Sequence, residues 1–211
     1  MPFVNEILAY RSVSIAGLEK NTGKTESLNY VLNRLKTMNT QIALTSIGVD
    51  GEKTDQVTRS PKPEITVYEG MIFVTSEKHY LERKIISEIL DVSQERTALG
   101  RLITARARLE GKVIISGPSG TVQMRNLIEN MEQYGVNTVI VDGALSRLSF
   151  ASPAVTDALI LATGASLSAN IPQLVSKTNF VKQLIELPLV EDELAKRLQK
   201  LKQGIWGIDK Y

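Results

Sequence analysis

A stretch bounded by glycines, residues 17–25 (GLEKNTGKT), most constrains how this chain can fold. It follows a short apolar run at residues 12–16 that is typical of a buried strand. It precedes a segment, residues 23–38, in which leucine and valine recur at helical spacing. The chain must therefore turn from a strand into a helix within a few residues, and glycine permits the tight backbone that such a turn requires.

The same stretch ends in Gly-Lys-Thr, the core of the phosphate-binding pattern G-x-x-x-x-G-K-[ST]. The spacing departs from that pattern by one residue, because five residues separate Gly17 from Gly23 and Leu18 stands where the first glycine would be. Backbone N–H groups in such a loop, together with the start of the following helix, attract phosphate oxygens. We therefore expect a nucleotide-binding loop, with these contributing residues: Gly17, Lys20, Asn21, Thr22, Gly23, Lys24 and Thr25.

Two acidic positions are candidates to complete this site. Asp142 ends an apolar run at residues 137–143, as expected of a strand whose final carboxylate holds Mg²⁺. Asp50 follows a second expected strand, residues 40–48, at the edge where parallel sheets bind ligands. We expect Lys24 to act on the terminal phosphate, Thr25 and Asp142 to hold Mg²⁺, and Asp50 to orient water or join the metal. A solvated acidic loop is the alternative for Asp50.

The order of expected elements predicts an α/β fold, a mostly parallel sheet flanked by helices, in a single domain over residues 1–211. The two strands on either side of the helix at 23–38 should be parallel. The middle third, residues 64–116, is expected to add an antiparallel elaboration. Its expected parts are strands at 65–68 and 71–75 about a tight turn, a short helix at 78–90, and a hairpin over 97–116.

Two features of the middle of the chain have an ordinary structural interpretation. Gly117-Pro-Ser-Gly-Thr121 precedes an expected helix at 122–134 and lacks the Gly-Lys of a phosphate loop. We interpret it as a capped strand-to-helix turn, although its glycines and helix start could bind an anion. His79, the single histidine, is expected to lie exposed at the start of a helix.

Composition narrows the class of protein. The net charge of +2 gives no reason to expect nucleic acid as a partner. The chain has no cysteine and therefore no disulfide or thiolate metal site. No apolar run approaches the roughly 18 residues of a membrane span, and the first residues lack the pattern of a secretory signal. We expect a cytoplasmic protein with no membrane partner.

Residues 20–25 (KNTGKT) resemble the loop of P-loop NTPases related to signal-recognition GTPases, MinD and dethiobiotin synthetase, and most closely that of molybdopterin-guanine-dinucleotide adaptor proteins. In MinD-like members a signature lysine stands five positions before the loop lysine, whereas Glu19 occupies that position here. Residues 45–52 (TSIGVDGE) and 141–144 (VDGA) also resemble small P-loop reactivase components that accompany cobalamin-dependent lysine and ornithine aminomutases. This second resemblance implies an aminomutase or a second reactivase subunit as partner.

Three functions follow from these observations. The favoured one is a Mg²⁺-dependent hydrolase that binds ATP and couples nucleotide state to a protein partner. A homodimer is compatible with this function. ATP is preferred over GTP because the sequence contains no Asn-Lys-x-Asp guanine signature. A small-molecule kinase or ATP-dependent ligase resembling dethiobiotin synthetase is the second. A scaffold that binds nucleotide without hydrolysing it is the third.

Overall fold

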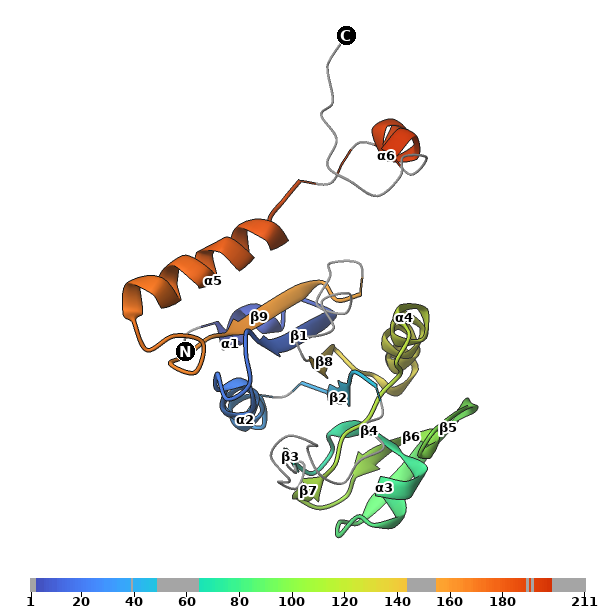
Figure 1. The fold of residues 1–211 in the computed structure, drawn as a ribbon. Helices are drawn as coiled ribbons and strands as arrows, with labels where there is room; N and C mark the ends of the chain where they lie inside the picture. The colour runs from blue at the N-terminus through green and yellow to red at the C-terminus, as the bar shows by residue number, and fades with distance from the viewer. Residues whose placement is uncertain are drawn as a thin grey trace.

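The computed structural model describes residues 3–38, 40–48, 65–143, 155–188, 190 and 192–198. Within these residues, one large sheet has the strand order β5-β6-β4-β2-β8-β1-β9, and β3 pairs with β7 in a second, small sheet (Figure 1). The strands are β1 (Ser12–Gly17), β2 (Ile42–Ser46), β3 (Ile65–Val67), β4 (Ile72–Ser76), β5 (Ser87–Thr97), β6 (Gly100–Ala107), β7 (Gly111–Val113), β8 (Thr138–Asp142) and β9 (Ala158–Ala162). The helices are α1 (Val4–Ile7), α2 (Lys24–Leu35), α3 (Glu77–Leu81), α4 (Thr121–Asn130), the 3-10 helix η1 (Met131–Tyr134), α5 (Ile171–Ile185) and α6 (Asp192–Leu198).

The large sheet is mixed and mostly parallel, which confirms the α/β class. Strands β4, β2, β8, β1 and β9 run parallel, while β6 is antiparallel to β4 and β5 is antiparallel to β6. Strand β1 lies between β8 and β9, with Ile15 opposite both Asp142 and Ile160. The carboxyl ends of β1, β8 and β2 therefore meet at one edge of the sheet, where doubly wound folds bind ligands.

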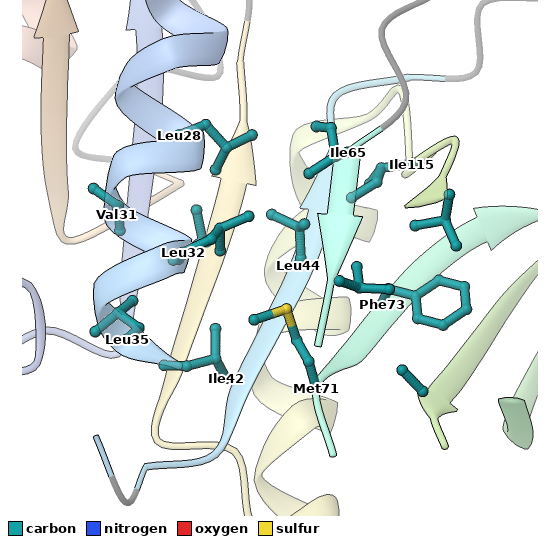
Figure 2. Packing of buried hydrophobic residues seen from close by; sticks show 14 of the residues in the cluster. Leu28, Val31, Leu32, Leu35, Ile42, Leu44, Ile65, Met71, Phe73 and Ile115 are labelled. Atoms are coloured by element: carbon teal, nitrogen blue, oxygen red, sulfur yellow. The ribbon is translucent and has the colours of Figure 1, made fainter. Parts of the chain in front are cut away.

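Side chains of the central strands alternate between two cores. On one face, α2 buries Leu28, Val31, Leu32 and Leu35 against Ile42 and Leu44 of β2, together with the small β3–β7 sheet (Figure 2). On the other face, Met124 and Ile128 of α4 pack against the alternate residues of β2, β4 and β8. Helices thus cover both faces and hold the parallel strands rigidly, as buried parallel strands require.

The helix expected at 78–90 is present only at the start of that range, and the hairpin expected over 97–116 is wrong. Helix α3 ends at Leu81, and the chain then forms β5, which pairs with β6 in a hairpin. The hairpin turns at Ala98 and Leu99, and Gly100 (φ 89°) begins β6 opposite Thr97. The sequence of β5 (SEILDVSQERT) lacks regular polar and apolar alternation, and its pairing with β6 contains two register shifts. Bulges of this kind break the period of two on which strand prediction depends.

The expected strands at 65–68 and 71–75 both exist, but they do not pair with each other. Strand β3 pairs with β7, and β4 enters the large sheet beside β2. Strand β7 is also shorter than expected: it ends at Val113, whereas the hairpin was expected to continue to residue 116. The exposed position expected for His79 is wrong as well: the residue is 6% exposed, and its Nδ1 lies 3.3 Å from Ser116 Oγ.

Helix α5 lies beyond the edge strand β9 (Figure 1). It starts where Asn170 Oδ1 accepts a hydrogen bond from Gln173 N–H, but none of its residues is buried. Its exposed apolar side chains include Phe180 and Leu184. Across the described residues, no helix is both long enough and apolar enough to cross a membrane.

Candidate functional site

The glycine-bounded stretch forms a compact loop between β1 and α2. Leu18 N–H donates to the carbonyl oxygen of Ala162 at 2.9 Å, which attaches the loop to the end of β9. The Thr22 hydroxyl donates to the carbonyl oxygen of Glu19 at 2.8 Å and closes the turn. Asn21 (φ 61°) and Gly23 (φ 89°) adopt the left-handed conformation. Asparagine and glycine are the residues that enter this region most readily, so the local sequence suits the loop.

Gly17 is required by a close approach within the loop. A Cβ at this position would lie 2.6 Å from Thr22 Oγ1 and 3.2 Å from the Glu19 carbonyl oxygen. Leu18, which replaces the glycine of the phosphate-loop pattern, is 9% exposed and part of the buried structure. The glycine that allows the chain to curl therefore stands one residue earlier than in the pattern, and the loop is closed around it.

Helix α2 begins directly at the end of this loop. Its N-cap is Gly23, and no side chain caps the first turn by a hydrogen bond. Lys24 and Thr25 are the first two residues of the helix and are partly exposed. The N–H groups of the first helical turn have no intrahelical partner, and the positive end of the helix dipole lies there. This end of α2 is thus suited to an anion.

Lys24 is paired with the carboxylate at the end of the neighbouring strand. Its Nζ lies 2.7 Å from Asp142 Oδ1, with the two side chains 28% and 16% exposed. This buried oxygen has no further hydrogen-bond partner in the described part of the chain. Two residues more than a hundred positions apart in the sequence, both predicted from it, therefore face each other at the edge of the sheet.

Asp142 is held in place by its backbone. It lies opposite Ile15 of β1 and Ser46 of β2 in the parallel register. The Ser46 hydroxyl donates to the Asp142 carbonyl oxygen at 3.2 Å, and Gly143 N–H donates to the carbonyl oxygen of Ile15 at 2.9 Å. The carboxylate is thus presented by the middle strand of three, directly beside the loop that follows β1.

The remaining predicted site residues take different positions. Lys20 and Asn21 lie exposed on the outer side of the loop, whereas Thr22 is 6% exposed. Asp50 lies outside the described residues. Two further contacts were not expected from the sequence: Ser46, which contacts the Asp142 backbone, and Ala162 at the end of β9. Each is a small residue that ends an apolar strand, and this was the only available signal.

The residues present fit a Mg²⁺ ion that is bound together with phosphates. Among the described residues, no three His, Cys, Asp or Glu side chains come together as a metal site. Mg²⁺ at a nucleotide does not need such a group, because it retains waters and takes one or two protein ligands besides phosphate oxygens. The buried Asp142 Oδ1 and the Thr25 hydroxyl at the start of α2 are ligands of the right kind.

Protein-family models, curated proteins and solved structures were all compared with this chain, and none of them matches it.

Proposed function

We propose that this protein is a Mg²⁺-dependent P-loop NTPase that binds ATP in preference to GTP and couples nucleotide state to a protein partner. The observation that supports this proposal best is the 2.7 Å ion pair between Lys24 of the loop helix and Asp142 at the end of β8. A loop lysine and a strand-end carboxylate are the two charged groups that phosphate and Mg²⁺ require.

In this proposal the ion pair is the resting state of the site. When nucleotide binds, Lys24 exchanges Asp142 for the terminal phosphates, and Asp142 and Thr25 become available to Mg²⁺. The Lys24 ammonium exchanges a carboxylate for phosphate, and the Asp142 carboxylate exchanges an ammonium for Mg²⁺. Neither charge is therefore left unpaired in a partly buried site. The loop N–H groups and the start of α2 hold the phosphates in position. The bound Mg²⁺ supplies charge neutralisation between the phosphates, which together with positioning accounts for most of the catalysis of phosphoryl transfer.

The resemblance stated above suggests the partner: this chain would be a reactivase or chaperone component, and it would act on a cobalamin-dependent aminomutase or together with a second reactivase subunit. The site is compatible with such a role because Asp142 is joined to the end of β2 through Ser46. A backbone movement at Asp142 would therefore act directly on the carboxyl end of the neighbouring strand β2.

Titration calorimetry with Mg·ATP and Mg·GTP tests the proposal on wild type, Lys24→Ala and Lys36→Ala. Lys36 is the matched control: it stands at the other end of α2 and pairs with Glu110 at 2.7 Å. Its hydrogen bond to Glu110 raises the pKa of Lys36, and this lysine is, like Lys24, paired with a carboxylate. We expect wild type and Lys36→Ala to bind one nucleotide equally and Lys24→Ala to lose at least tenfold in affinity.

If none of the three proteins binds either nucleotide, or if Lys24→Ala binds as tightly as wild type, the proposal is wrong. If binding follows the expected pattern, hydrolysis assays separate the functions that remain. Slow basal turnover stimulated by a protein partner supports the coupling role. Stimulation by a small acid instead indicates a kinase or ligase, and binding without turnover indicates a scaffold.

A further inference from the structure

A concave site lies away from the glycine loop and is not explained by nucleotide binding. It is a cavity of about 580 Å³ between the β5–β6 hairpin and α4. Residues of β5 and β6 form one wall, and α4 with the preceding Pro118-Ser-Gly120 forms the other. Its size is within the range of ligand-binding clefts.

The lining of this groove mixes polar and apolar groups in about equal measure and is almost uncharged. Asp91 and Arg96 are its charged residues and have opposite signs, while most other polar groups in it are hydroxyls and amides. Leu102 and Leu127 are among its apolar residues. A groove of this composition does not attract phosphate or another strongly charged ligand, and its polar groups need an occupant that offers both donors and acceptors.

Three amide side chains mark the α4 wall. Gln123, Asn126 and Asn130 line the groove from one stripe of the helix, at positions i, i+3 and i+7. Within the described residues, the amide groups of Asn126 and Asn130 make no hydrogen bond to the protein, and both residues are exposed. A side-chain amide carries donors and an acceptor, as a peptide bond does. The stripe spans about 10 Å, the length of about three extended residues.

The opposite wall of the groove, formed by β5, is irregular. Strand β5 is the last strand of the large sheet, and its two register shifts fall between Ile89 and Asp91 and between Val92 and Arg96. The residues around these bulges line the groove. Bulges re-aim side chains and are common beside functional sites. An open groove with one wall of amides and one bulged edge strand suits an extended chain better than a small ligand, which is usually enclosed by mainly apolar walls.

We propose that this groove binds an extended, uncharged polar segment of a protein partner, about three to four residues long, through hydrogen bonds to its backbone. This inference deepens the proposed function and rests on it for the partner. The groove wall is joined to the nucleotide site: Gly48 N–H donates to the Pro118 carbonyl oxygen at 2.9 Å, and Gly117 N–H donates to that of Gly48 at 3.2 Å. Gly48 follows β2, whose Ser46 contacts Asp142.

Gly117 is needed for this connection. A Cβ there would lie 1.8 Å from the Ser46 carbonyl oxygen, so only glycine lets the two segments approach so closely. The path from Asp142 through Ser46 and Gly48 to Pro118 is a continuous series of contacts. If occupancy of one site changes affinity at the other, thermodynamic linkage requires the reverse effect to be equal in size.

The test uses a library of random heptapeptides displayed on phage and selected on the full chain. Synthetic fluorescent copies of the enriched peptides are then titrated by anisotropy against wild type, Asn126→Ala/Asn130→Ala and Asn179→Ala/Gln183→Ala. The last variant is the matched control, because it removes two exposed amides from α5, far from the groove in sequence and outside its lining. Alanine favours helix at all four positions, so both variants should fold.

We expect enriched peptides to be mostly uncharged, and we expect the Asn126→Ala/Asn130→Ala variant to bind them about tenfold more weakly than wild type or the control. Failure to enrich any peptide overturns the inference, as does equal binding by all three proteins. Self-association that is lost in the groove variant would assign the groove to a second copy of this chain and would also overturn it.

The same titrations are repeated with saturating Mg·ATP on wild type and Lys24→Ala. Coupling predicts that ATP changes peptide affinity for wild type only. If peptides bind the groove but ATP binds neither protein, the proposed nucleotide function is wrong and the peptide-binding inference is retained. If ATP binds and no peptide does, the groove inference fails alone.

Discussion

At the scale of single residues, the candidate site depends on positions where no larger side chain fits. Gly17 approaches Thr22 and the Glu19 carbonyl so closely that the loop closes around it. Gly164 touches the same loop from the other side, but a Cβ there would lie 3.4 Å from the Thr22 carbonyl oxygen, an ordinary contact distance. Two glycines beside one loop therefore differ in what they tolerate.

We expect Gly17→Ala to destabilise the protein by about 1–3 kcal/mol, since the added methyl group must displace the loop. ATP affinity should fall with it, because the displaced backbone is the part that would hold phosphate. Gly164→Ala should change the free energy of unfolding by less than about 0.5 kcal/mol. Urea unfolding and calorimetry on the two variants check this. Equal effects of both substitutions would show that the close approach at Gly17 is not required.

At the scale of elements, the sequence predicted those parts whose signals are local. The strand, loop and helix around Gly23 and the strand ending in Asp142 follow from apolar runs and glycine positions, and the structure contains all of them. The bulged β5 gave no period of two, and the pairing of β3 with β7 joins segments that are not neighbours in the chain. Non-local pairing depends on how the elements pack, which local patterns do not record.

Strand β9 illustrates how one side chain secures an element. Asp157 Oδ2 accepts hydrogen bonds from Ser12 N–H at 2.9 Å and from the Ser12 hydroxyl at 3.0 Å. Ser12 is 2% exposed, so Asp157→Ala leaves a buried donor without its partner. We expect a loss of about 1–3 kcal/mol and faster hydrogen exchange in β9. Glu129→Ala, an exposed control on α4, should be nearly neutral. Unchanged exchange in β9 would contradict this role of Asp157.

At the scale of the whole molecule, apolar side chains are distributed unevenly. The two cores on either side of the large sheet contain many fully buried residues, while α5 contains none. Stability should therefore come from the sheet and from α2 and α4, and α5 should contribute little. Two phenylalanines, one in each environment, allow a direct comparison.

We expect Phe73→Ala to cost about 3–5 kcal/mol, because Phe73 of β4 is fully buried and its loss leaves a cavity (Figure 2). Phe180→Ala on α5 should cost less than about 0.5 kcal/mol, since Phe180 is 61% exposed. Guanidinium unfolding monitored by circular dichroism measures both. A large loss of stability for Phe180→Ala would show that α5 is packed more firmly than its exposure indicates.

The place of β1 in the sheet has a consequence for biosynthesis. This strand leaves the ribosome well before its two neighbours, because β8 and β9 follow it by more than a hundred residues. Translation of the residues between Ser12 and its partner Val139 takes about 6–25 s at the usual rates. Throughout that interval the glycine loop has neither Asp142 nor Ala162 to hold it. The nascent protein can thus complete the candidate site around Lys24 only after β8 and β9 have been made.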